Sequence, residues 1–148
     1  MIPLIVLGAF TIIVVIVLVA GWLIRRTVTR AQQRVETLCP RPKQSTRANC
    51  MGHSASQPQT RGLGLLAYDK QQLVFAAGLR TRTLVIPRAS ITDATASKTF
   101  TRPGKSIRTA VPRVLTVHWR TDDGDEAIAG WQLPNHDTAA AFAKALRR

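Results

Sequence analysis

The hydrophobic pattern of the chain begins with one long uncharged run. No residue from Ile2 to Ile24 carries a charge, and these 23 residues would form a helix of about 34 Å at 1.5 Å per residue. Because a bilayer core is about 30 Å thick, the run predicts a transmembrane helix over residues 2–24. Trp22 lies at the end of the run, where an amphipathic ring suits the membrane interface.

A cleaved signal peptide is the alternative interpretation of this segment. Such peptides begin with a basic region and carry an apolar run of about 7–15 residues before a cleavage site. Here the start has no Lys or Arg, the run is longer, and arginines follow it. The pattern therefore favours a retained anchor.

Basic residues follow the apolar run, and none precedes it. Arg25, Arg26, Arg30 and Arg34 come first, and two more basic residues occur by position 43. Lys and Arg near a span are retained on the cytoplasmic side. We therefore expect a single-pass protein of the cell membrane, with its N-terminus outside and residues 25–148 in the cytoplasm, where its two thiols would stay reduced.

The next segment, residues 25–38, keeps a helical period. Its apolar positions Val28, Ala31, Val35 and Leu38 recur at spacings of three and four residues. The pattern predicts a juxtamembrane basic helix. Its arginines either hold anionic lipid or only fix the topology.

Residues 39–60 contain three prolines and many small polar residues, and they nearly lack large apolar side chains. Because proline breaks helices, we expect a flexible linker here. Cys39, Cys50 and His53 lie in this segment, but three ligands at this spacing match no common zinc site. The stretch CMGH also lacks the first cysteine of a haem attachment motif. We expect no metal and no cofactor, and any other role of these three residues stays open.

Short apolar stretches separated by turn residues fill the chain from residue 61 onward. The pattern predicts strands in LGLLAY, QQLVFAAG, RTLVIP, ITDATASKTF, VLTVHWR and AIAGWQL. Residues 101–113 contain two prolines and a glycine, and we expect a loop there. After Pro134 we expect a helix, capped by Asn135 or Asp137, with Phe142 and Leu146 in its buried stripe.

This order of antiparallel strands followed by one helix resembles the pleckstrin-homology-like fold, most closely its bacterial branch, which is similar to GRAM domains. The segments that carry the resemblance are GLLAYDKQQLVFAAG, RTLVIPRASI, VLTVHWR and TAAAFAKAL. It implies that residues 61–148 form a small antiparallel β-barrel or sandwich capped by the terminal helix. It also implies a domain of the kind that actinobacterial proteins often tether to one transmembrane helix. The expected fold class is thus a membrane-anchored α+β protein.

Charge is the main functional signal. The formal net charge is +13, which points to an anionic neighbour. The basic pattern that phosphoinositide-binding relatives carry around their first strand–strand loop is absent, because that loop contains Lys70 alone, beside Asp69. The candidate contacts for anionic lipid are Arg25, Arg26, Arg30, Arg34, Arg80, Arg82, Arg102, Lys105 and Arg108.

Other function classes find little support in the motifs. No nucleophile elbow, zinc-protease motif or phosphate-binding glycine loop occurs, so we expect no enzyme. Binding to single-stranded nucleic acid would add aromatic stacking platforms to a basic groove, and the aromatics here fit core positions. We expect a membrane-tethered adaptor or regulator of a membrane-associated partner, most simply another membrane protein. The alternative is an anionic-lipid-sensing module at the inner leaflet.

Overall fold

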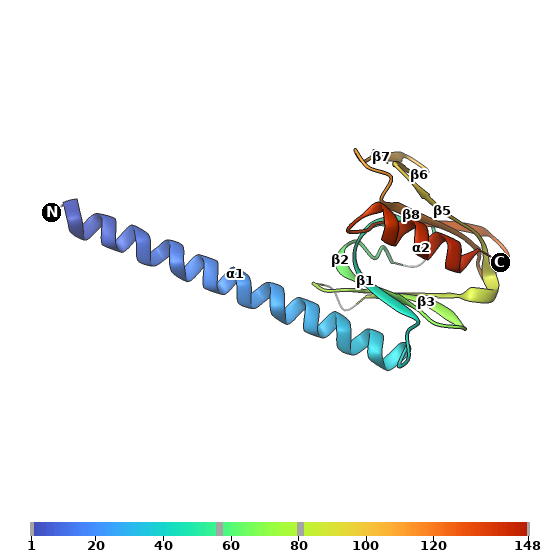
Figure 1. The fold of residues 1–148 in the computed structure, drawn as a ribbon, viewed down its shortest axis with the longest axis horizontal. Helices are drawn as coiled ribbons and strands as arrows, with labels where there is room; N and C mark the ends of the chain where they lie inside the picture. The colour runs from blue at the N-terminus through green and yellow to red at the C-terminus, as the bar shows by residue number, and fades with distance from the viewer. Residues whose placement is uncertain (1, 56–57, 80–81, 148) are drawn as a thin grey trace.

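One helix, α1, runs without a break from Ile2 to Leu38 and leads into the folded domain (Figure 1). The computed structural model describes residues 2–55, 58–79 and 82–147, and it describes side chains from residue 12 onward. From Ile12 the helix is long and apolar enough to cross a membrane, and its most apolar stretch, with mean hydropathy 2.0, has no buried residue. It is a candidate membrane span, although an N-terminal signal sequence meets the same criterion.

Seven antiparallel strands form the main sheet, in the order β4-β3-β2-β1-β9-β8-β5. Their bounds are β1 Gln44–His53, β2 Gly62–Tyr68, β3 Gln72–Ala77, β4 Thr83–Pro87, β5 Ile91–Ser97, β8 Val114–Arg120 and β9 Glu126–Gln132. The sheet bends into two facing layers, as in a β-sandwich (Figure 1). Its end strands β4 and β5 do not pair, so the sheet is open. Of the two architectures expected from the sequence, a barrel or a sandwich, the closed barrel does not form.

The predicted C-terminal helix is confirmed as α2, His136–Leu146. Asn135 caps it, because its side-chain oxygen accepts a hydrogen bond from the Thr138 N–H at 2.8 Å. Phe142 is fully buried and meets the Tyr68 ring edge-on, with centroids 5.1 Å apart. The helix thus packs its apolar stripe into the core between the two layers.

The prediction of a flexible linker over residues 39–60 is wrong, because residues 44–53 form the central strand β1. β1 pairs with β2 on one side and with β9 on the other. Its buried side chains include the small Ala48 and Cys50, which share the main core cluster with large residues such as Phe75 and Trp131, and Met51 and His53 near its end. The strand is therefore central although Met51 is its one large apolar residue, whereas several such residues usually mark a central strand.

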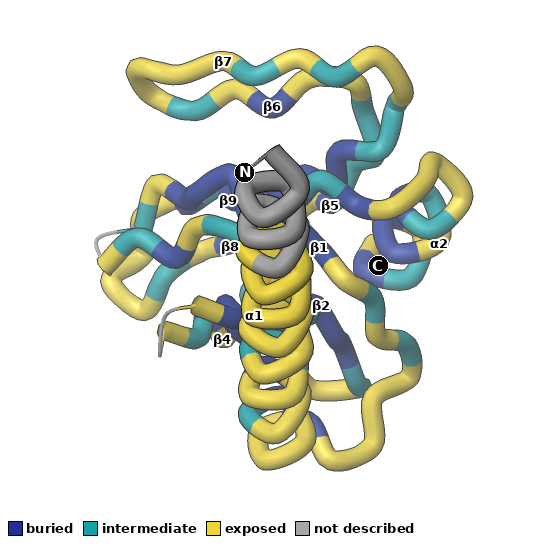
Figure 2. The backbone as a smooth tube through the Cα atoms, turned by 90° about the vertical axis from the view of Figure 1, so that its left-hand side faces the viewer, coloured by how far each residue is buried: buried dark blue, intermediate teal, exposed yellow. Residues whose placement is uncertain are grey.

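The prediction of a loop over residues 101–113 is also wrong in part. Strands β6, Thr99–Arg102, and β7, Lys105–Arg108, form a separate hairpin, with Pro103 and Gly104 as its two-residue turn. Gly104 adopts a φ of +74°, which suits glycine. The hairpin projects from the main sheet (Figures 1 and 2) and is held to it by the buried ring of Phe100.

A further 3-10 turn, Arg88–Ser90, follows β4. It lies beside the β2–β3 turn, because the Arg88 N–H donates to the Gln71 carbonyl at 2.7 Å. The turn after β3, which contains Leu79, therefore lies at the opposite end of that strand. The end of β3 near Leu79 lies beside Thr27 of α1, whereas Gln72 at the other end contacts Leu38, the last residue of α1.

Candidate membrane-facing site

The second half of α1 packs on the outer face of β2 and β3. Two residues of the helix, the cysteine that follows it and three residues of the sheet form a buried cluster of their own. Its members are Ala31, Val35, Cys39, Ala67, Val74 and Ala76. Small side chains let the helix approach the sheet closely, so the domain sits directly against the helix that continues the candidate span (Figure 1).

Hydrogen bonds reinforce this contact at both of its ends. The Arg34 guanidinium donates to the carbonyl of Ala77 at the end of β3. The Gln72 amide donates to the carbonyl of Leu38 at the end of α1. Packing and hydrogen bonds together hold the second half of α1 against the sheet.

The Cys39 thiol belongs to this contact. It donates to Asp69 Oδ2 at 3.4 Å. Burial, together with this hydrogen bond and the negative charge of Asp69, raises the pKa of the Cys39 thiol to about 11. The thiol is therefore neutral and inert near pH 7. Burial likewise raises the pKa of the Cys50 thiol to about 12, although nearby Arg61 and Arg102 act in the other direction.

An apolar groove of about 320 Å³ lies between α1 and the sheet; we call it the α1 groove. Arg47 is the one charged residue in its lining. The lining consists of Leu23, Ile24, Thr27, Val28, Ala31, Arg47, Leu63, Gly64, Leu65, Gly78 and Leu79. Leu63 and Leu79 are 72% and 84% exposed, although they are large and apolar. Leu23 and Ile24 end the uncharged run of α1, so the groove begins where the candidate span ends.

The predicted basic residues fall into separate groups. Arg25, Arg26 and Arg30 are exposed on α1, and the Arg26 guanidinium lies 5.0 Å from the centre of the Trp22 ring. Arg34, by contrast, is half-buried against the sheet. Lys105 and Arg108 are exposed on β7, away from α1. Arg80 lies outside the described residues.

Arg102 comes together with Arg61, a residue that the sequence did not single out. Both approach Gly52, where the β1–β9 pairing shifts by one residue. A Cβ at Gly52 would lie 3.0 Å from Arg61 Nε and 3.5 Å from Arg102 Cζ, and its φ of +116° also requires glycine. Arg82 lies near them, because it donates to the carbonyl of Gln59 at 3.1 Å and the Gln59 side chain also approaches Gly52.

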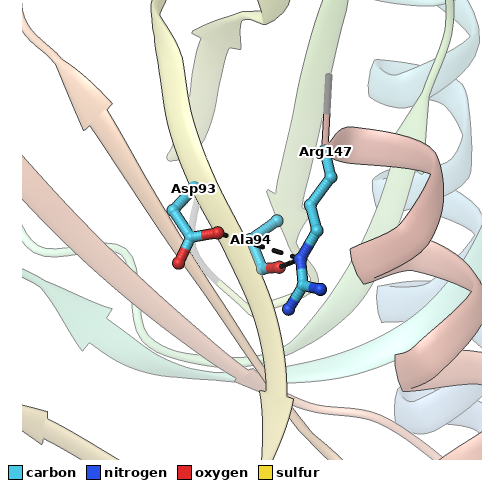
Figure 3. A network of polar contacts seen from close by, with 3 residues as sticks. All are labelled: Asp93, Ala94 and Arg147. Atoms are coloured by element: carbon cyan, nitrogen blue, oxygen red, sulfur yellow. Dashed lines mark hydrogen bonds and ion pairs between the residues drawn. The ribbon is translucent and has the colours of Figure 1, made fainter.

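In the part of the chain that the structure describes, no acidic side chain forms an ion pair with this group of arginines. Within the described residues, the ion pair that forms is Arg147 with Asp93 at 3.8 Å (Figure 3). Arg147 Nε also donates to the Ala94 carbonyl at 2.7 Å, which ties the end of α2 to β5. Arg61 and Arg102 thus remain available to an external anion.

His53 lies beside this group and is fully buried. Its Nε2 accepts a hydrogen bond from the Thr60 N–H at 3.2 Å, so the ring holds the β1–β2 connection in place. Burial lowers the pKa of His53, and the positive charges of Arg102 and Arg61 act in the same direction. No three His, Cys, Asp or Glu side chains in the described part of the chain come together in a way that could hold a metal ion.

Leu63, Leu79, Arg47 and Arg61 were missed by sequence reasoning. The available signal was the placing of each leucine directly after a glycine, in RGLGLL and AGLR, at the end of a predicted strand. Leu63 is the second residue of β2, and Leu79 lies in the turn after β3, so each stands at an end of its strand. The surface that the two leucines share depends on how α1 docks, and the sequence pattern does not show that.

Comparison with known proteins indicates the fold alone. No protein-family model matches the chain, and no curated protein matches it. Among solved structures, a similar one is the crystal structure of the C-terminal domain of an unknown protein from Leishmania infantum. It is 16% identical, with a TM-score of 0.50 over 78% of this chain and 92% of that chain. The chain therefore shares its α+β architecture with that domain.

Proposed function

We propose that this chain is a single-pass, non-enzymatic membrane module with a pleckstrin-homology-like domain that rests on the cytoplasmic leaflet and binds its anionic lipids. The observation that carries the proposal is the position of Leu63 and Leu79. They share the α1 groove with Leu23 and Ile24, the last apolar residues of the candidate span. Because α1 and the sheet form one unit, a bilayer around the span would meet both leucines.

The chemistry of this surface suits an anionic interface. Full burial of a leucine side chain contributes about 1.5–3 kcal/mol, and each Lys or Arg near an anionic surface contributes about 1 kcal/mol. Arg25, Arg26 and Arg30 occupy the first turns of α1 after the apolar run. The anchor also keeps the domain at the surface, so that weak contacts suffice for binding.

The pleckstrin-homology-like assignment is part of the same proposal. It is supported by the bent antiparallel sheet and by α2 packed into its open side. The cytoplasmic placing of the domain is supported by the arginines that follow the apolar run. Nothing in this assignment requires catalytic residues.

A fluorescent probe can test whether Leu79 meets the bilayer. Leu79→Cys would be labelled with an environment-sensitive dye in the full chain, reconstituted into neutral or anionic lipid nanodiscs. Cys39 and Cys50 are buried and have raised thiol pKa values, so the new thiol is the one that reacts. We expect a blue-shifted emission that is larger in anionic nanodiscs and weaker in high salt.

The matched control is Ala89→Cys. Ala89 is exposed, and it lies in the 3-10 turn at the opposite end of β3 from Leu79. A dye attached at this position should show the emission of a water-exposed probe in both neutral and anionic nanodiscs. Equal spectra for the two positions in both lipids would contradict the proposal.

An adaptor for another membrane protein is the second proposal, and the arginine group at Gly52 favours it. Arg61 and Arg102 form no ion pair within the described residues, so an acidic segment of a partner could supply one. A photoreactive side chain in place of the exposed Pro103 would capture such a partner in intact membranes. The adduct should be lost when Arg61→Glu reverses the charge, and it should survive Lys144→Glu on α2.

A further inference from the structure

We propose that the α1 groove holds an acyl chain of an anionic membrane phospholipid. This inference rests on the proposed function, since it needs α1 in a membrane. It goes further by assigning an occupant to a specific cavity. The argument depends on the lining of the groove, its position along α1 and the charge at its edge.

The groove is lined for a hydrocarbon. Leucines, isoleucine, valine and alanine supply most of its wall, and its volume of about 320 Å³ lies at the lower end of the range of ligand pockets. Leu65 lines the groove, is half-buried and packs against the buried cluster of α1 and the sheet, whereas Leu63 is exposed, so we take Leu65 as the groove floor. Water gains few hydrogen bonds in such a space, and apolar cavities of proteins tend to stay dry and to take up apolar ligands.

The position of the groove selects a lipid as its occupant. Leu23 and Ile24 are 47% and 62% exposed, and in a membrane they would contact lipid chains. The groove starts at these residues and continues to Ala31, which is about 12 Å further along α1 at 1.5 Å per residue. This length crosses the headgroup layer, which is about 5–8 Å thick on each side. The lipid-exposed surface of the span therefore runs into the groove along Ile24, Val28 and Ala31, and Thr27 is the polar residue that α1 adds to the lining.

Charge at the edge of the groove selects an anionic lipid. Arg47 is exposed on β1 and is part of the groove lining. It makes no ion pair within the described residues, so it can face a phosphate. A lipid with one chain in the groove would place its headgroup among Arg47 and the arginines of α1.

Photocrosslinking with a labelled lipid tests this occupant. The full chain would be reconstituted in nanodiscs that contain phosphatidylglycerol with a diazirine on its acyl chain, and adducts would be mapped by mass spectrometry after illumination. We expect adducts at Leu65 on the groove floor, in addition to adducts along the span. The 3-10 turn at Ala89 should carry none.

A groove-filling variant separates the groove from simple surface contact. Val28 is half-buried and lines the groove, so Val28→Trp should lower the Leu65 adduct at least fivefold while adducts at the exposed Leu63 and Leu79 remain. The matched control is Thr29→Trp, an exposed change on α1 outside the groove lining. It should leave the Leu65 adduct unchanged.

The remaining outcomes distinguish failure of this inference from failure of the proposed function. Adducts at Leu63 and Leu79 without any at Leu65 would overturn the groove site and leave the surface contact intact. Adducts confined to the span would overturn both. A Leu65 adduct that Val28→Trp does not reduce would also overturn the groove site, as would a crosslink from Leu65 to another polypeptide.

Discussion

Gly78 lies against Thr27 where the end of β3 meets α1: a Cβ on Gly78 would come within 3.2 Å of Thr27 Cβ and 3.3 Å of its carbonyl oxygen. The glycine thus sets the distance between the helix and the sheet. Its conformation does not itself demand glycine, because its φ is not positive.

Gly78→Val should therefore push α1 away from the sheet. Overpacking typically costs about 1–3 kcal/mol, and here the helix contact is what gives way. Hydrogen exchange of the amides around Val35 should become faster, while the amides of β8 keep their protection. Gly21→Ala is the control, because a Cβ there meets nothing within 4 Å. Unchanged exchange in Gly78→Val would show that α1 does not depend on this close approach.

A second close approach fixes the β6–β7 hairpin. The Phe100 ring covers Gly130 of β9, where a Cβ would come within 2.4 Å of the ring. Gly130→Ala should lower the free energy of unfolding by about 1–3 kcal/mol. In the background of Phe100→Ala the same change should cost much less, because the ring that it displaces is gone. Additive losses in urea unfolding of the double variant would refute this pairing.

Removing the core contact of α2 should lower the free energy of unfolding more than the glycine substitutions above. Phe142→Ala removes a fully buried ring that packs on Tyr68 and should cost about 3–5 kcal/mol. Small domains have about 5–15 kcal/mol in total, so the melting temperature should fall strongly. Lys144→Ala on the exposed side of α2 should change it little. A parental melting curve for Phe142→Ala would mean that α2 does not stabilise the sheet.

His53 should make stability depend on pH in the mildly acidic range. Its pKa is lowered in the folded protein, so the unfolded chain binds the proton more readily. The contribution of His53 to stability is complete above its unfolded pKa of about 6.5, and it declines as the pH falls below that value. Urea unfolding at pH 7.5 and 5.5 should show a loss that is smaller in His53→Gln.

Asp69 provides the contrast for that measurement. Partial burial opposes its ionisation, but hydrogen bonds from the Gln71 and Gln72 N–H groups and from Cys39, with the charge of Arg88, lower the pKa of Asp69 overall. Its contribution is therefore complete above about pH 3.8 and is lost only below that value. A loss between pH 7.5 and 5.5 that is equal in the parent and in His53→Gln would exclude the histidine as its cause.

The elements that the sequence predicted well are those that their own side chains mark, either by a helical period or by an apolar run between turn residues. In α2, Phe142 and Leu146 recur at the helical period, and both are buried. The β2–β3 hairpin follows from two apolar runs around Asp69, whose carboxylate accepts from the N–H groups of the turn. These patterns are local, and local patterns are visible in a sequence.

The parts that were missed depend on distant neighbours. β1 is a central strand because β2 and β9 flank it, although Met51 is its one large apolar residue and most of its other residues are small or polar. The arginine group at Gly52 joins Arg61, which directly precedes β2, to Arg102 from the β6–β7 hairpin. Arg34 was expected to contact lipid, but in the fold its guanidinium donates to the Ala77 carbonyl. No spacing rule connects positions that meet only through the sheet topology.

The unbroken path from α1 into the sheet has a consequence for membranes of different thickness. In the anchored arrangement proposed above, a span longer than the local hydrocarbon layer tilts to match it. A flexible linker between span and domain would absorb that rotation. Here the hydrogen bond from Arg34 to Ala77 and the buried cluster between α1 and the sheet would pass the rotation on to the domain. The angle of the domain to the surface would then follow bilayer thickness, and Leu63 and Leu79 would be raised from the lipid or lowered into it accordingly.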